Sequence, residues 1–157
     1  MGSPPCDNCG TSTTGCGNSA GAGATLEAYG SSWTANQACL GASVGSVSRL
    51  VLLAEGMPAQ QVCLFFQGDQ QVPGPSNDTG QPFGDGLRCV EANVIKIEVV
   101  TTDAAGRAAT TVDVAATGQV QVGDRKHYQA RYRDPGGLCM NGFNLTNGLE
   151  LLWDPSD

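Results

Sequence analysis

The chain has few charged side chains and almost no lysine. Only 15% of its 157 residues are Asp, Glu, Lys or Arg, and the two lysines are Lys96 and Lys126. Fifteen acidic residues against eight basic ones give a net charge of −7. This balance excludes a nucleic-acid binder that neutralises phosphates with a basic patch, and it excludes a polybasic membrane anchor. No apolar run approaches the roughly 18–20 residues that a bilayer-spanning helix needs.

Histidine occurs once, as His127, which excludes any catalytic scheme built on two histidines. No Gly-x-Ser-x-Gly nucleophile motif occurs either. Cys6-x-x-Cys9 with Cys16 nearby offers half of a zinc knuckle, but the second cysteine pair that a tetrahedral site needs is missing. We therefore expect no enzyme, no metal and no cofactor, with His127 facing the surface or a neighbouring strand.

A loop over residues 68–86 gathers several oxygen-bearing side chains, namely Asp69, Asn77, Asp78 and Asp85. Ca²⁺ takes several oxygen ligands, so this loop is a candidate calcium site. The Asp-x-Asp-x-Asp-Gly pattern is absent, and Asp and Asn are also ordinary turn formers. We expect these residues to shape turns.

Cysteine, by contrast, is plentiful. The seven candidates for disulfide bonds are Cys6, Cys9, Cys16, Cys39, Cys63, Cys89 and Cys139. This density in a short chain favours an oxidising compartment, so we expect a secreted protein at the cell surface or outside the cell. The first residues show no basic segment followed by an apolar one, so no signal peptide is visible. Because seven is odd, one cysteine is free or pairs with another chain.

Hydrophobic periodicity predicts strands. No dozen-residue segment carries a helical apolar stripe, and 22 glycines oppose helix formation. Alternating or short apolar runs bounded by turn residues predict strands over residues 24–29, 49–55, 61–67, 87–90, 94–102, 106–114, 119–122, 126–133 and 149–153. We expect an all-β fold, a disulfide-stapled antiparallel β-sandwich of about eight strands with a jelly-roll-like arrangement; a closed barrel is the alternative. The short Gly-Pro turn predicts an antiparallel hairpin of 49–55 with 61–67.

The first 23 residues differ from the rest. They hold Pro4-Pro5, three cysteines and a Thr/Ser run, and they lack a hydrophobic period. We expect residues 1–23 to be a tail or linker and residues 24–157 to be the β-sandwich domain. The tail is either flexible or stapled to the body or to a neighbouring subunit, since a purely flexible tail has no use for three thiols.

Four segments together carry a resemblance: Leu64-Phe65-Phe66-Gln67-Gly68, Pro82 to Cys89, Tyr128 to Pro135, and Phe143 to Gly148. In this order they resemble an uncharacterised β-rich module found near the C-termini of large secreted and surface proteins of planctomycetes, myxobacteria and related bacteria. The resemblance covers residues 14–155 and implies an extracellular, non-catalytic accessory or structural module with no catalytic residues to carry over. It also implies a Cys16–Cys89 disulfide.

These observations predict a secreted structural or adhesive unit that associates with itself, as an oligomer or filament, through its N-terminal tail. A carbohydrate-binding module is the alternative, with extracellular polysaccharide as the partner. Its candidate platform is Trp33, which lies in a polar loop, with Tyr29 beside it and Tyr128 and Tyr132 as further contributors. The competing interpretation places these aromatic residues in the core or at its rim.

Overall fold

The computed structural model describes residues 6–9, 13–30, 50–73 and 80–153. Over these ranges the chain forms strands and one short helix, α1 (Val114–Thr117). The strands are β1 (Thr25–Tyr29), β2 (Val51–Glu55), β3 (Val62–Gly68), β4 (Gln70–Gln71), β5 (Gln81–Phe83), β6 (Gly86–Arg88), β7 (Val90–Glu91), β8 (Ile95–Thr101), β9 (Ala108–Ala109), β10 (Arg125–Arg133), β11 (Phe143–Leu145) and β12 (Leu149–Leu152). The predicted all-β class is confirmed.

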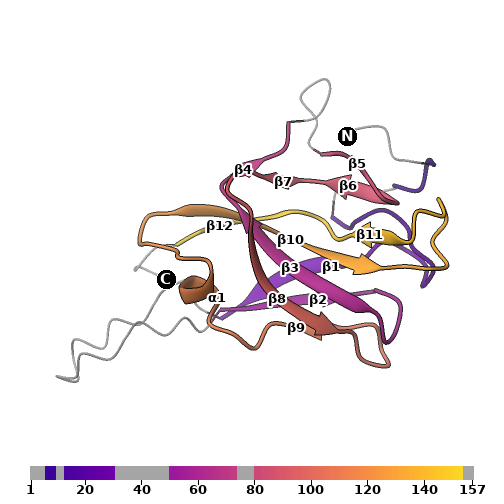
Figure 1. The fold of residues 1–157 in the computed structure, drawn as a ribbon, viewed down its shortest axis with the longest axis horizontal. Helices are drawn as coiled ribbons and strands as arrows, with labels where there is room; N and C mark the ends of the chain where they lie inside the picture. Colours follow the sequence, from indigo (N-terminus) through magenta and orange to yellow (C-terminus); the bar gives the residue numbers. More distant parts are fainter. Residues whose placement is uncertain (1–5, 10–12, 31–49, 74–79, 154–157) are drawn as a thin grey trace.

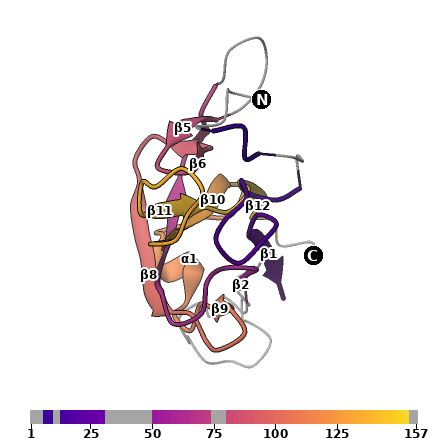
Figure 2. The same cartoon turned by 90° about the vertical axis from the view of Figure 1, so that its right-hand side faces the viewer.

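Two antiparallel sheets form the body. The larger runs β11-β10-β3-β8, and β12 pairs with the other half of β10. The smaller runs β1-β2-β9. Figures 1 and 2 show the two sheets as layers, with β8 on one side of the molecule and β1 and β2 on the other. This is the layered arrangement of a β-sandwich; its jelly-roll connectivity stays a prediction.

The core lies between the two layers. Leu26 and Leu52 reach it from the smaller sheet, and Phe65 and Tyr132 from the larger one. Because side chains alternate along a strand, each sheet turns one face to this core and the other outward. The alternation predicted for residues 24–29 is confirmed: Ala24 and Leu26 are buried, whereas Tyr29 is exposed.

The predicted hairpin of residues 49–55 with 61–67 is wrong. Strand β2 pairs with β1 and β9, whereas β3 pairs with β10 and β8 in the other sheet. Between them Gly56 adopts a φ of +77°, and the side chain of Met57 is buried in the core. The turn therefore carries the chain from one layer to the other, with Met57 buried in the core at the crossing.

The expected strands at 106–114 and 119–122 are also corrected. Only Ala108–Ala109 pairs in the first segment, and α1 follows it. Asp113 caps this helix, since its side chain accepts a hydrogen bond from the backbone N–H of Ala116. Residues 119–122 form turns after the helix, where Val120 N–H donates to the carbonyl of Ala115. A four-residue helix is too short to show a hydrophobic period.

Strand β8 changes face along its length. The sequence predicts Ile95, Ile97 and Val99 on one face, yet Ile97 is buried and Val99 is 61% exposed. The register against β3 shifts between Phe65 and Phe66, where two residues of β8 lie opposite one of β3. Such a bulge exchanges the faces of all later residues, so Val99 points outward.

The long loop predicted over residues 68–86 contains two short strands, β4 and β5, and the equally unpredicted β11 lies further along the chain. Strands β5 and β6 form a hairpin with Gly84 at the first turn position, where its φ of +60° suits a type II′ turn. Beside this hairpin, Phe66, Val90 and Leu145 form a second apolar cluster on the outer side of the larger sheet. In the described ranges no helix is both long enough and apolar enough to cross a membrane.

Candidate functional site

A pocket of about 260 Å³ lies where the N-terminal segment, β6, β7, β10 and β12 meet. Its wall includes the Cys9 and Cys16 sulfurs, the free thiol of Cys89 and the lone histidine, His127. Glu150 lies beside His127, with 3.7 Å between Nε2 and Oε2. Thr146, Asn147 and Gln71 also line the pocket, but the Thr146 hydroxyl and the Asn147 amide are already hydrogen-bonded within the protein. The polar side chains that remain at the pocket are those of His127, Glu150 and Gln71.

Two cysteines are free in the described part of the chain, and neither is set up as a nucleophile. Burial raises the pKa of the Cys63 thiol to about 12. Burial also raises the pKa of Cys89, although hydrogen bonding at Gly148 and Gln129 works against it. The reactive form of cysteine is the thiolate, so both groups stay protonated and weakly reactive at neutral pH.

We expect alkylation of the native protein by iodoacetamide at pH 7 to label Cys89 slowly and Cys63 more slowly still. Cys63 is fully buried, whereas Cys89 is half-buried and lines the pocket. Both rates should rise with pH, because each raised pKa keeps the thiolate fraction small until the pH approaches it. Peptide mapping of the labelled sites measures the order; prompt labelling of Cys63 would contradict the structure.

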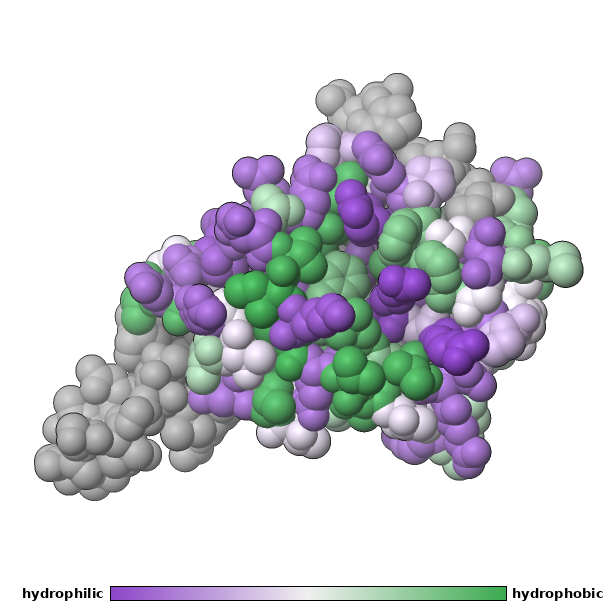
Figure 3. All heavy atoms as spheres, in the orientation of Figure 1, coloured by the Kyte–Doolittle hydropathy of each residue, from purple (hydrophilic) through white to green (hydrophobic). Residues whose placement is uncertain are grey.

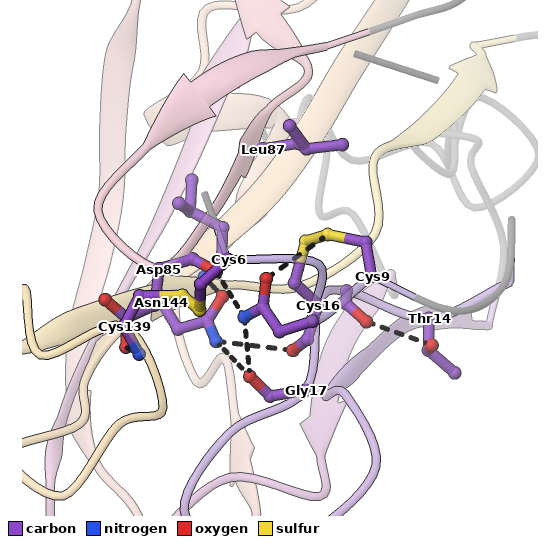
Figure 4. Close-up of a disulfide and its surroundings, with 12 residues drawn as sticks. Cys6, Cys9, Thr14, Cys16, Gly17, Asp85, Leu87, Cys139 and Asn144 are labelled. Atoms are coloured by element: carbon purple, nitrogen blue, oxygen red, sulfur yellow. Dashed lines mark hydrogen bonds between the residues drawn. A yellow bond between two sulfur atoms is a disulfide. The ribbon is translucent and has the colours of Figure 1, made fainter. Parts of the chain in front are cut away.

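Two disulfides in the described residues involve the N-terminal segment, one joining it to the body and one closing a loop within it. Cys6 pairs with Cys139, and Cys9 pairs with Cys16 (Figure 4). The Cys16–Cys89 pairing implied by the resemblance is therefore wrong. Cys16 forms its disulfide with Cys9, seven residues away, and Cys89 is a free thiol. Of the other candidates, Cys63 is unpaired, and Cys39 lies outside the described residues.

Hydrogen bonds reinforce this attachment. The side chain of Asn8 donates to the carbonyl of Asp85 at 2.7 Å. Asn18 is buried, and its side chain donates to the carbonyl of Gly56 at 2.8 Å and to the Tyr132 hydroxyl at 2.9 Å. The described part of residues 1–23 thus fits a defined site on the sandwich.

A second contact ties the same segment to the end of β10. The backbone N–H of Ser19 donates to the buried Asp134 carboxylate at 3.0 Å, and the Ser19 hydroxyl donates to the same carboxylate. Deeper in the segment, the amide of Asn144 on β11 donates to the carbonyl of Gly17 at 2.9 Å. These contacts satisfy backbone and side-chain groups that burial would otherwise leave unpaired.

The central residue of the predicted aromatic platform lies outside the described residues, so the platform stays a prediction. Trp33 lies outside them, and Tyr29 stands exposed on β1, an edge strand. A hydrogen bond to the Glu27 carboxylate raises the pKa of the Tyr29 phenol. Tyr128 and Tyr132 are buried in the core and cannot join Tyr29. Burial of these two residues follows the competing interpretation, that the aromatic side chains build the core.

The acidic loop is organised by turns and ion pairs where the structure describes it. The buried Asp85 carboxylate accepts the backbone N–H groups of Cys139 and Asn141, at 3.1 and 2.9 Å. Asp69 pairs with Lys126 at 2.6 Å, which lowers the pKa of its carboxyl. Asn77 and Asp78 lie outside the described residues. No described group of His, Cys, Asp or Glu side chains could hold a metal ion.

Sequence reasoning missed a buried glutamine beside the pocket. Gln129 lies on the outward side of β10, yet it is fully buried beneath β6 and β7. Its side chain accepts the backbone N–H of Cys89 at 2.9 Å and donates to the carbonyls of Leu87 and Thr146 at 2.8 and 2.7 Å. A glutamine in an alternating strand carries no signal of this role, because the same pattern predicts an exposed side chain.

No protein-family model matches the chain, and neither a curated protein nor a solved structure shows significant similarity to it.

Proposed function

We propose that the chain is a secreted, non-catalytic structural or adhesive unit that assembles with copies of itself through residues 1–23. One observation carries this proposal: the N-terminal segment is an arm that fits a defined site on the sandwich and is fixed there by the Cys6–Cys139 disulfide. The resemblance to an extracellular accessory module agrees with it, as do disulfides suited to an oxidising compartment.

An arm with its own docking site can leave its own sandwich and occupy the same site on a neighbouring copy. This exchange needs no new contact, because the same hydrogen bonds from Asn8, Asn18 and Ser19 form between two chains. Gly21 lies before β1 with a φ of +135° and open space around its Cα, so we place the hinge of the exchange at this residue. In the exchanged form the Cys6–Cys139 disulfide joins neighbouring molecules.

Electrophoresis without reductant tests this mechanism. We expect protein secreted through an oxidising compartment to give a ladder of disulfide-linked species that collapses to monomer on reduction. Cys6→Ser should abolish the ladder. The matched control, the double variant Cys9→Ser/Cys16→Ser, removes the other disulfide and should retain it.

Light scattering and electron microscopy of the same samples measure the size and form of the assemblies. A protein that stays monomeric at all concentrations without reductant, or a ladder that persists in Cys6→Ser, would overturn exchange of the arm.

A further inference from the structure

The basic side chains divide into two groups. Among the residues that the structure describes, Arg107 pairs with Glu55, Arg125 with Glu150, and Lys126 with Asp69. The other described cations have no carboxylate within ion-pair distance. They are Arg88, Lys96, Arg131 and Arg133.

These four cations share the outer side of the larger sheet, and together they are called the basic face. Arg131 and Arg133 lie two residues apart on β10 and point away from the core, opposite in direction to the buried Tyr132. Lys96 on β8 lies opposite Phe66, whose side chain is also on the outer side. Arg88 reaches the same region from the β5–β6 hairpin, over the ring of Phe83.

Aromatic rings hold the central arginine in place. The Arg131 guanidinium lies 4.0 Å from the ring centre of Phe143 and 5.3 Å from that of Phe83. The two rings meet edge to face at 5.1 Å. Arg88 lies 5.8 Å from the Phe83 ring centre. Stacking fixes the guanidinium plane and leaves its N–H edges available, because a ring face accepts no conventional hydrogen bond.

Apolar side chains lie among these cations. Val99 on β8 is 61% exposed. It lies opposite Leu64 on β3, and Leu64 in turn lies opposite Arg131 on β10. Val62 and Phe83 on the same side are also exposed. Figure 3 shows apolar side chains gathered over β3 and β8 in the middle of this side, with strongly hydrophilic ones between them. The basic face is therefore both cationic and apolar, on a molecule with a net charge of −7.

We propose that the basic face binds an acidic polysaccharide, one that carries carboxylates on its sugar rings. This inference rests on the adhesive role proposed above and names its ligand. Guanidinium groups bind carboxylates through paired hydrogen bonds, and Arg131 is already oriented to do so. The C–H faces of sugar rings pack against exposed apolar and aromatic side chains such as Val99 and Phe83.

The mixture of cationic and apolar side chains favours this polymer over a nucleic acid. A phosphate backbone is bound by dense basic patches. Here four cations are separated by valine, leucine and phenylalanine side chains, and the rest of the molecule is acidic. A polymer whose sugar rings each carry a carboxylate and an apolar C–H face matches this mixture.

Affinity electrophoresis in gels that contain polygalacturonate tests the proposal, with neutral galactan as the comparison polymer. We expect polygalacturonate to retard the protein, galactan to leave it unaffected, and added salt to weaken the binding through screening. The double variant Arg131→Gln/Arg133→Gln should bind about tenfold more weakly or worse. Arg107→Gln removes a positive charge that is paired elsewhere, and should bind as the parent does. Circular dichroism establishes that each variant is folded.

Retardation by galactan equal to that by polygalacturonate, or an Arg107→Gln variant as weak as the double variant, would overturn the assignment. So would tighter binding to single-stranded DNA, which would identify a phosphate polymer as the ligand. The two proposals fail separately. If the disulfide ladder forms but polygalacturonate does not bind, the ligand proposal is wrong and the assembly proposal stands. If polygalacturonate binds but no ladder forms, only the assembly proposal is wrong.

Discussion

Replacing Cys6 and Cys139 together with serine should lower the free energy of unfolding by about 5 kcal/mol, since a long closed loop restricts the unfolded chain most. This disulfide joins residues 133 positions apart. The double variant Cys9→Ser/Cys16→Ser opens a loop of only seven positions and should lose about 2 kcal/mol. Urea unfolding of monomeric protein, followed by circular dichroism, measures both.

The comparison between the two variants is the informative part. Each variant removes one disulfide and two sulfur atoms. They differ in the length of the loop that is opened, and only the Cys6–Cys139 bond joins the N-terminal segment to the body of the molecule. A short-loop variant that loses as much stability as the long-loop variant would show that local contacts around Cys16, which is buried, dominate over the loop closed by Cys6. Adding reductant to the parent protein should reproduce the sum of the two losses.

Replacing Gln129 with leucine should cost about 3 kcal/mol or more, although leucine has a similar volume and is apolar. The side chain of Gln129 satisfies three backbone groups, on Cys89, Leu87 and Thr146. Leucine leaves all three without a partner in a buried setting, and each such group costs about 1–3 kcal/mol. Thermal and urea unfolding measure the loss.

Gln71→Leu provides the control for this prediction. Gln71 is exposed on β4, so the same change there should alter the unfolding free energy by no more than about 0.5 kcal/mol. A Gln129→Leu variant as stable as Gln71→Leu would mean that water or a shifted backbone satisfies the three groups. A Gln129→Leu variant that fails to fold at all agrees with the expected loss.

Alternation of apolar and polar residues predicted the strands well wherever one face of the strand is buried and the other is exposed to solvent. The core face of residues 126–133 follows the rule, since Tyr128, Ala130 and Tyr132 are all buried as the pattern indicates, whereas Gln129 on the opposite face is buried against it. The same rule failed where a local feature exchanged the faces. The bulge opposite Phe65 turned Val99 outward, and no residue type marks it in the sequence.

The hydrophobic pattern could not predict which strands pair or which cysteines form disulfides. A Gly-Pro turn indicates that the chain reverses, but it does not decide whether the next strand joins the same sheet or the opposite one. Here the next strand joins the opposite sheet, and Met57 in the connection is buried in the core. Disulfide connectivity is similarly open in a sequence with seven cysteines, because it depends on which sulfurs the fold brings together.

The candidate site was predicted in its parts and not in its arrangement. The sequence singled out His127 and Cys89 separately, and folding places both on one pocket with Glu150. The net charge correctly described the molecule as acidic overall, but it gave no sign that unpaired cations gather on the basic face. Ion pairs neutralise Arg107, Arg125 and Lys126, so the cations that remain on one side are more prominent than a total of −7 suggests.

The Cys6–Cys139 bond also decides how the molecule responds to a pulling force at its two ends. In a molecule whose arm is docked on its own sandwich, tension that enters at residue 6 passes through the disulfide to residue 139 and bypasses the polypeptide in between. Strands β1 to β10 lie within that bypassed stretch, so only the short terminal region with β11 and β12 can be drawn out. A unit tethered in this way keeps its sandwich intact under load for as long as the bridge stays oxidised.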